Sequence, residues 1–324
     1  MFANPSRPTS ARVGLRLLLA AALVAGAAFD VPTAHAATRS AATLASKWAA
    51  DPAVLWAGTA DHGDWSAGWG PAGPGRISSL SLVTGPGGGR GRSVRVPHPG
   101  GGTRSSRWGY DGRFSFAKLG IAPLEEAYLR YDVWFPSGYD FAKQGKMPGL
   151  QGVIPGGSVW WPSETISCPS TSEYRGSDCH DDRQFGARTM WKNGAMVTYL
   201  NVVGIGGVNH NDNRSGGGMI SFIFPYVDAR GARLELRPGW NTVEQRVRLN
   251  TPGRRNGVFE GWVNGVRGIS RSDVEYRASG RASLKITQWN FAHFWGGPAT
   301  DYPVKATEAL YDDVVLSTRY VGAS

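Results

Sequence analysis

Short runs in which hydrophobic and polar residues alternate occupy most of the chain, and glycine and proline separate them. Alternation with a period of two residues is typical of strands that bury one face. The clearest run covers residues 127–135, where Leu129, Tyr131 and Val133 share a face, and Pro136 ends it. The same pattern predicts strands over residues 93–97, 187–192, 196–203, 219–225, 240–249, 258–263, 282–291 and 309–317.

Turn signals and the scarcity of helical periodicity indicate the fold class. Asn264 and Gly265 form the dipeptide that best suits a type I′ hairpin turn after the strand over residues 258–263. Residues 41–50 are the one plausible helix. Many strands at roughly regular spacing, without intervening helices, favour an all-β sandwich or jelly roll.

The first 36 residues have the pattern of a signal peptide. Three arginines accompany an apolar run over residues 13–29, and a small-residue cleavage signal ends at Ala36. After this point, no apolar run of the sequence approaches the length of a membrane-spanning helix. We therefore expect a secreted, extracellular protein that leaves the membrane after cleavage, with residues 37–324 as a single domain and a monomer.

The net charge is +10, and most of it remains after residue 36. A secreted protein this basic is expected to meet an acidic partner. Nucleic acid is disfavoured because the sequence has no basic helix, zinc-ligand spacing or Lys/Arg run. An extracellular polyanion, such as a uronic-acid polysaccharide, fits the compartment better. The alternative is a basic surface that serves only solubility.

The chain has two cysteines, Cys168 and Cys179. A secreted protein reaches an oxidising compartment, so we expect these two to form a disulfide. The loop that it closes is short, and it would pin a surface excursion rather than hold the fold together.

Several residue types in the sequence suit β-elimination from a uronic-acid polymer. This reaction needs a cation on the carboxylate, a base for the C5 proton and an acid for the leaving oxygen. Arginine suits the first role, and a lysine or tyrosine beside other cations can be the base. Candidates near strand or loop boundaries are Lys146, Arg188, Tyr199, His180, His210 and His293.

Two other site chemistries fit the sequence less well. A glycoside hydrolase normally needs two facing carboxylic acids, and carboxylate pairs of the Glu-x-Asp-x-Glu kind are missing from the sequence. Residues 209–213 resemble part of a calcium loop, but Arg214 stands where the sharp-turn glycine belongs. We expect neither a metal nor an organic cofactor.

Motifs in a shared order resemble polysaccharide lyase family 14, the alginate and glucuronan lyases. The resemblance covers roughly residues 90–320. The most characteristic motif is Lys146-Met147-Pro148-Gly149-Leu150, which comes soon after residues 133–141. The further motifs follow in order: residues 186–194, Tyr199, and residues 239–243, 249–253, 262–265, 294–297 and 311–314.

This resemblance implies a fold and a set of roles. The family folds as a concanavalin A-like β-jelly roll with a concave substrate groove. Lys146 would be the essential lysine of the loop beside the groove, Arg188 would bind the uronate carboxylate, and Tyr199 would be a base or acid. Gly186 and Asn201 stand where the family has Ser and a second Tyr. On extended strands, Gly186 shares a face with Arg188, and Tyr199 with Asn201, so all four are expected to line one groove.

Three readings of the function remain open. The first is a lyase on an anionic polysaccharide, in which Gly186, Asn201, His180 and His210 help to bind the substrate. The second is a non-catalytic carbohydrate-binding protein, motivated by the two departures from the family pattern. The third is a hydrolase with an unusual carboxylate pair. Tryptophans that either stack on sugars or fill the core are Trp160, Trp161, Trp289 and Trp295, and Trp161 is the one expected to stack.

Overall fold

The computed structural model describes residues 47–48, 50–61, 80–86, 91–102, 108–141, 144–156, 183–207, 214–215, 219–220, 222–296 and 305–323. All of them belong to one compact unit, residues 37–324. The residues expected to form the signal peptide lie outside this part of the chain. Of the helix predicted over residues 41–50, only residues 47, 48 and 50 are described, and they are in turns.

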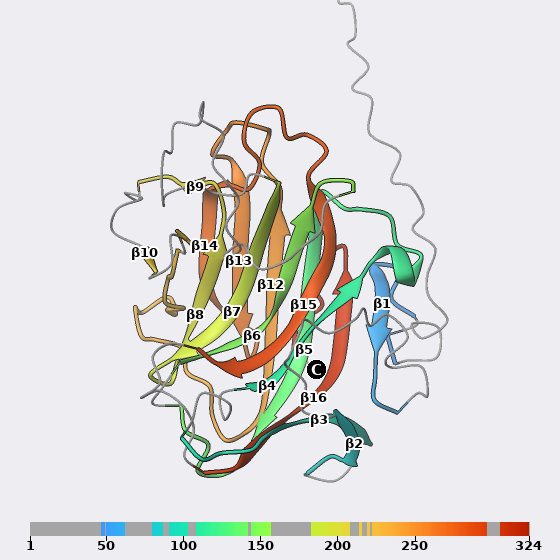
Figure 1. Ribbon diagram of the computed structural model, residues 1–324, viewed down its shortest axis with the longest axis vertical. Coiled ribbons are helices and arrows are strands. Elements are labelled where there is room, and N and C mark those ends of the chain that lie inside the picture. Colours follow the sequence, from blue (N-terminus) through green and yellow to red (C-terminus); the bar gives the residue numbers. More distant parts are fainter. Residues whose placement is uncertain are drawn as a thin grey trace, which may run out of the picture. The chain divides into compact units, whose positions relative to one another are not determined.

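Among the described residues, the strands form two large antiparallel sheets and one small one (Figure 1). The nine-stranded sheet contains β1 (Val54–Gly58), β2 (Ser81–Thr84), β3 (Arg92–His98), β5 (Glu126–Phe135), β9 (Gly204–Ile205), β12 (Gly239–Arg248), β13 (Gly257–Val263), β14 (Val266–Glu275) and β16 (Thr307–Ser317). The five-stranded sheet has the order β4 (Trp108–Ser115), β15 (Lys285–Trp295), β6 (Gln144–Val153), β7 (Gln184–Lys192) and β8 (Ala195–Asn201). The small sheet pairs β10 (Arg214–Ser215) with β11 (Met219–Ile220).

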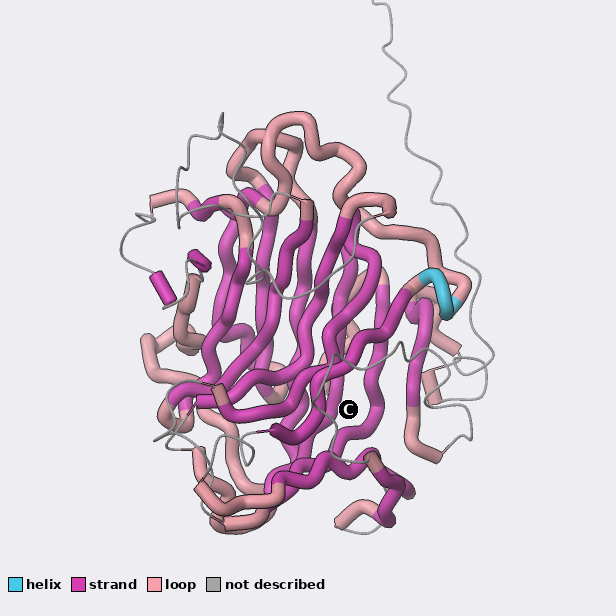
Figure 2. Tube along the Cα trace, viewed as in Figure 1, coloured by secondary structure: helices cyan, strands magenta, loops and turns pink. Residues whose placement is uncertain are grey.

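Strands dominate the described chain, as the tube in Figure 2 shows. The helix in the described ranges is the single 3₁₀ turn η1 (Ala117–Leu119). No helix of these ranges is long and apolar enough to cross a bilayer. The all-β jelly-roll class predicted from alternation is therefore confirmed.

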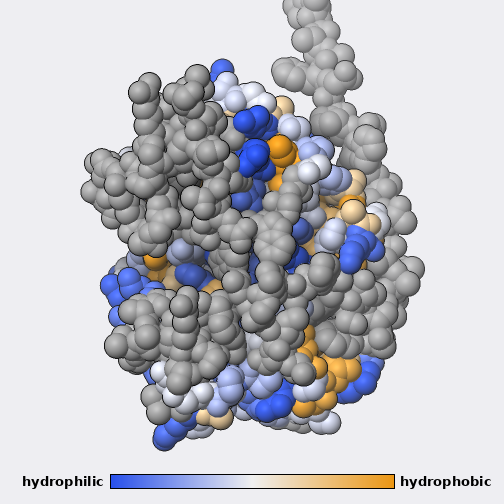
Figure 3. All heavy atoms as spheres, in the orientation of Figure 1, coloured by the Kyte–Doolittle hydropathy of each residue, from blue (hydrophilic) through white to orange (hydrophobic). Residues whose placement is uncertain are grey.

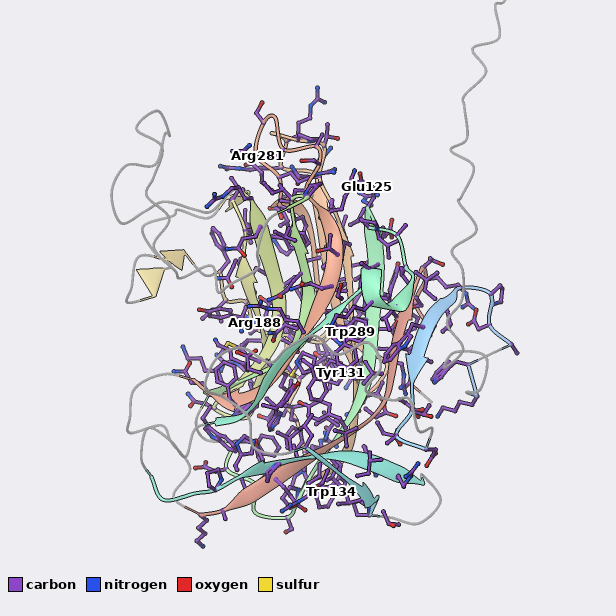
Figure 4. All side chains as sticks on the ribbon, turned by 45° about the vertical axis from the view of Figure 1, so that its right-hand side comes forward. Glu125, Tyr131, Trp134, Arg188, Arg281 and Trp289 are labelled. Carbon is purple, nitrogen blue, oxygen red and sulfur yellow. The ribbon has the colours of Figure 1, made fainter. Side chains whose placement is uncertain are left out.

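One hydrophobic cluster lies between the two large sheets. It contains Leu129 and Val133 from β5, Leu150 from β6 and Trp289 from β15, each fully buried. Figure 4 shows Trp289 and Tyr131 among the densely packed side chains of this interior. The two-residue period of the strands explains the arrangement, because it sends alternate side chains into one shared core.

The structure confirms the strands with the clearest alternation. The run over residues 127–135 is β5, and the run over residues 240–249 is β12, paired with β5 over its whole length. Asn264 and Gly265 have φ angles of 50° and 79°, as a type I′ turn requires. Of the strand predicted over residues 219–225, the structure describes only β11 and isolated bridges at Phe222 and Pro225.

Strand β6 was not predicted as a strand, because its sequence is rich in glycine and contains Pro148. The structure explains one of these glycines directly: a Cβ on Gly149 would collide with the backbone of Ala187 on β7. Pro148 lies where the pairing of β6 with β7 shifts register, so its missing N–H interrupts no regular ladder. Strands β1, β2 and β4 were missed as well.

Candidate active site

The outer face of the five-stranded sheet brings four of the predicted residues together. Strands β7 and β8 pair so that Arg188 lies opposite Tyr199 and Gly186 lies opposite Asn201. Their sequence neighbours Ala187 and Leu200 point into the core, which places these four on the other face. The shared face predicted from alternation is thus confirmed, while the roles of the residues stay predictions. Figure 3 views this sheet from outside, and the described residues visible over its middle are mostly hydrophilic.

Arg188 belongs to a row of residues that crosses all five strands in register. From β4 to β8 this row, which we call the basic row, consists of Arg113, Asn290, Gly149, Arg188 and Tyr199. Asn290 donates a hydrogen bond from Nδ2 to Oδ1 of Asp111, at 2.8 Å. Arg113, Asp111 and Asn290 were not predicted as site residues, because β4 was not predicted and the face of β15 could not be chosen from its sequence.

Lys146 lies on strand β6 and not in the loop that the family resemblance implied. It pairs with Phe294 on β15 and with Met190 on β7. Directly after it, residues 147 and 148 of β6 lie opposite the single residue Thr189 of β7. This extra residue on β6 forms a β-bulge. The Lys146 Nζ lies 3.2 Å from the centroid of the Tyr199 ring and donates to Met190 Sδ at 3.4 Å. Lys146 and Tyr199 are therefore in direct contact.

Hydrogen bonds from the interior fix the bulge beside Lys146. Thr189 faces the core, and its Oγ1 donates to the carbonyl oxygen of Pro148 at 3.0 Å. Tyr131, on β5 of the opposite sheet, lies with its hydroxyl 2.7 Å from the same Oγ1. All three groups are buried. Since Thr189 uses its own hydrogen for Pro148, the Tyr131 hydroxyl donates to Thr189. A chain of two hydrogen bonds thus links the nine-stranded sheet to the bulge.

Burial and neighbouring charges change the protonation of Lys146. Its side chain is only 9% exposed. Burial lowers its pKa well below the ordinary value, and the positive charges of Arg188 and Lys192 lower it further. Each of these causes favours the uncharged amine. Lys146 is therefore suited to accept a proton.

Arg188 supplies the positive charge next to this amine. Its side chain is 1% exposed, and its guanidinium carbon lies 5.3 Å from the Tyr199 ring centroid. Burial lowers the pKa of Arg188, while Tyr199 and Asp111 raise it. An arginine stays protonated even when it is shifted in this way, because its ordinary pKa is so high. Figure 4 shows Arg188 on β7, away from Tyr131 and Trp289 in the interior.

His293 does not join this site, which corrects its place among the candidates. It lies on β15 with its ring in the core, where Tyr311 contacts Nδ1 at 2.6 Å and Tyr139 contacts Nε2 at 2.9 Å. Burial lowers its pKa well below the ordinary value, and the neighbouring His98 lowers it further, which favours the neutral ring. Alternation along β15 turns His293 inward, and both of its ring nitrogens are hydrogen-bonded to the tyrosines there. Trp289 and Trp295 are fully buried as well, as core residues.

Five of the predicted site residues lie outside the described residues. These are Trp161, His180, His210, Cys168 and Cys179, and Trp160 lies outside them too. Their predicted roles, and the disulfide, stay predictions. Within the described ranges, no group of three His, Cys, Asp or Glu side chains is placed to hold a metal ion.

Two glutamines on this face, Gln151 of β6 and Gln288 of β15, were not predicted either. Gln288 Nε2 donates to Gln151 Oε1 at 2.8 Å. Their cross-strand pairing with a residue already predicted for the site could have identified them, because Gln151 pairs with Gly186 and Gln288 pairs with Gln151. This pairing can be predicted only once β6 is known to be a strand.

Comparisons with known proteins agree with this fold. The structure is similar to the alginate lyase from Aplysia kurodai (TM-score 0.59, 18% identity, 74% of this chain and 87% of that chain covered). It is also similar to the alginate lyase vAL-1 from Chlorella virus (TM-score 0.51, 17% identity, 74% and 89% covered). A third similar structure is the endo-β-1,4-glucuronan lyase from the fungus Trichoderma reesei (TM-score 0.50, 11% identity, 82% and 96% covered). A search of curated proteins found no match.

The family model of polysaccharide lyase 14 matches residues 90–314. This match covers more than half of the chain and includes Lys146, Arg188 and Tyr199. It confirms the resemblance that the ordered motifs indicated. The chain belongs to the polysaccharide lyase 14 family.

Proposed function

We propose that this chain is a secreted lyase that cleaves a uronic-acid polysaccharide by β-elimination. The observation that carries the proposal is the contact between the Lys146 amine and Tyr199, next to the buried guanidinium of Arg188. The signal-peptide pattern of residues 1–36 supports secretion. Membership of a polysaccharide lyase family supports the reaction class.

The residues on this face match the three requirements of elimination. Arg188 binds the uronate carboxylate and stabilises the negative charge that spreads onto it as the C5–H bond breaks. The Lys146 amine takes the C5 proton, which its lowered pKa permits at moderate pH. The bond from C4 to the leaving oxygen then breaks, a C4–C5 double bond forms, and the Tyr199 hydroxyl gives its proton to that oxygen.

A carbohydrate-binding protein without catalysis is the second candidate. Gly186 and Asn201, the two departures from the family pattern, are direct cross-strand partners, so both changes fall at one place in the site. A hydrolase is disfavoured, because Asp111 is the one carboxylate on the five strands of this sheet, and hydrolysis normally needs two.

The direct test is the ultraviolet absorbance of an unsaturated uronate during incubation with a panel of polyuronates. We expect the wild-type protein to produce this absorbance on at least one polymer. Arg188→Ala and Lys146→Ala should each lower kcat by about 100-fold or more, since each removes a group of the transition state. Lys118→Ala, on the exposed turn η1, is the control and should match wild type. Full activity of Lys146→Ala would refute the role of that lysine, and binding without product would favour the second candidate.

Thr189 is expected to be a positioning residue for Lys146. Thr189→Val keeps the shape of the side chain but removes both hydrogen bonds at the bulge, so we expect kcat to fall about 10- to 100-fold with KM little changed. Thr189→Ser should restore the activity. Thr198→Val is the matched control: Thr198 pairs with Thr189, faces the same interior and accepts a hydrogen bond from the Phe224 N–H. Equal losses of kcat in both valine variants would show a merely structural role.

If Lys146 is the base, its pKa sets the pH at which kcat/KM falls on the acidic side of the pH profile. Because Lys192 lowers this pKa, Lys192→Met should raise it, so more of the amine is protonated at a given pH. The acidic limb of kcat/KM should therefore move to higher pH. Lys118→Met, remote from Lys146, should leave the limb in place. An unchanged or lower-pH limb in Lys192→Met would contradict Lys146 as the base.

A further inference from the structure

Next to the basic row lies a second row that also crosses all five strands and carries no charge. From β4 to β8, this amide row consists of Ser115, Gln288, Gln151, Gly186 and Asn201. Gln288, Gln151 and Asn201 are 9%, 5% and 5% exposed. The amide side chains of Gln151 and Asn201 thus flank Gly186 on the two neighbouring strands, two residues from Arg188 along β7.

Nothing in the backbone requires a glycine at position 186. Its φ angle is not among the positive ones, and within the described part of the chain the three atoms nearest to the place where a Cβ would stand are side-chain atoms. The nearest atoms to that place are Asn201 Oδ1 at 3.6 Å and Gln151 Nε2 at 3.8 Å. Gly149, in contrast, is held to glycine by the backbone of Ala187. A glycine inside a buried strand without such a constraint is typical of a place where a ligand approaches closely.

The polar atoms nearest this space favour a hydroxyl group over a carboxylate, because Asn201 Oδ1 is an acceptor and Gln151 Nε2 is a donor. Gln184, two residues before Gly186 on the same face of β7, is 6% exposed, and its Oε1 is a buried acceptor without a hydrogen-bond partner among the described residues. A carboxylate can only accept hydrogen bonds and cannot satisfy that oxygen, whereas a hydroxyl both donates and accepts. An unsatisfied buried acceptor destabilises the protein until a donor reaches it.

Charge on this face also separates the two rows. The cations Arg113 and Arg188 belong to the basic row, and Lys146 lies beyond it. On the other side of the amide row, Lys285 is paired with Glu125. Since the described residues of the amide row include no cation, a carboxylate there would lose its hydration without a cation in its own row.

We propose that the amide row, with the space at Gly186 as its centre, is a subsite for an uncharged sugar unit. The hydroxymethyl group of that unit, which stands where a uronate has its carboxylate, enters the space between Gln151 and Asn201, with the Gln184 amide next along β7. This inference rests on the proposed lyase function, because it places the neutral unit beside the uronate that Arg188 binds. It assigns the substrate to polysaccharides that combine uronate with neutral sugars.

The test compares two polymers: one of uronate only, and one in which uronate alternates with a neutral hexose. We expect the wild-type kcat/KM to be about tenfold or more higher on the alternating polymer, since a site built to hydrogen-bond a hydroxyl discriminates by at least one such bond. An equal or higher kcat/KM on the uronate homopolymer would overturn the proposal.

Two variants locate the preference in the subsite. Gly186→Ala fills the space with a methyl group that its surroundings accept at ordinary contact distance, and Gln184→Leu removes the acceptor. Each should lower kcat/KM on the alternating polymer by about tenfold, mainly through KM, and lower it less on the homopolymer. Gln144→Leu is the matched control, an amide on β6 seven positions before Gln151, and should keep the wild-type ratio. Equal losses on both polymers would contradict the assignment.

Binding separates this proposal from the proposed reaction. If neither polymer yields an unsaturated product, the lyase function fails, and calorimetry then tests the subsite alone. A mixed uronate–hexose oligosaccharide should bind the wild-type protein about tenfold more tightly than Gly186→Ala. Equal affinities would overturn the subsite without reference to catalysis.

Discussion

Strand β7 faces two environments at once, and the rest of the site depends on this constraint. Its inward residues Ala187 and Thr189 pack into the core between the sheets, while Gly186 and Arg188 lie on the outer face. Thr189 is bonded to Tyr131 of the opposite sheet and to Pro148 of the bulge. Because successive side chains of a strand point in opposite directions, fixing Thr189 also fixes Arg188.

The buried cations give this face its preference for an anion. Lys146 and Arg188 both lie away from water, and burying two neighbouring positive groups is costly. The molecule lowers the cost by favouring the uncharged amine of Lys146 and by placing the Tyr199 ring against both groups. A uronate carboxylate at Arg188 would add a negative charge to that of Asp111, which already favours the charged guanidinium. The buried positive charge that opposes folding therefore favours an anionic ligand, and the uncharged Lys146 amine lies beside that ligand as a base.

Sequence alone predicted the parts of this architecture that depend on local alternation. Strands β5 and β12 follow from a period of two residues, as do the face that Gly186 shares with Arg188 and the face that Tyr199 shares with Asn201. The turn at Asn264 follows from the Asn-Gly dipeptide. Strand β6 could not be predicted in this way. Its Gly149 is required by the close backbone of Ala187 on another strand, and no local sequence pattern reveals that contact. The position of Lys146 therefore came from the family resemblance, which implied a loop.

The central claim is that this face performs elimination, and isotope labels in one experiment test it most directly. An oligouronate with deuterium at C5 is cleaved in water enriched in heavy oxygen, and the products are weighed by mass spectrometry. The account predicts that the unit at the new non-reducing end loses its deuterium, gains a double bond and takes up no heavy oxygen. Products that keep the deuterium and gain one heavy oxygen would show hydrolysis and contradict it.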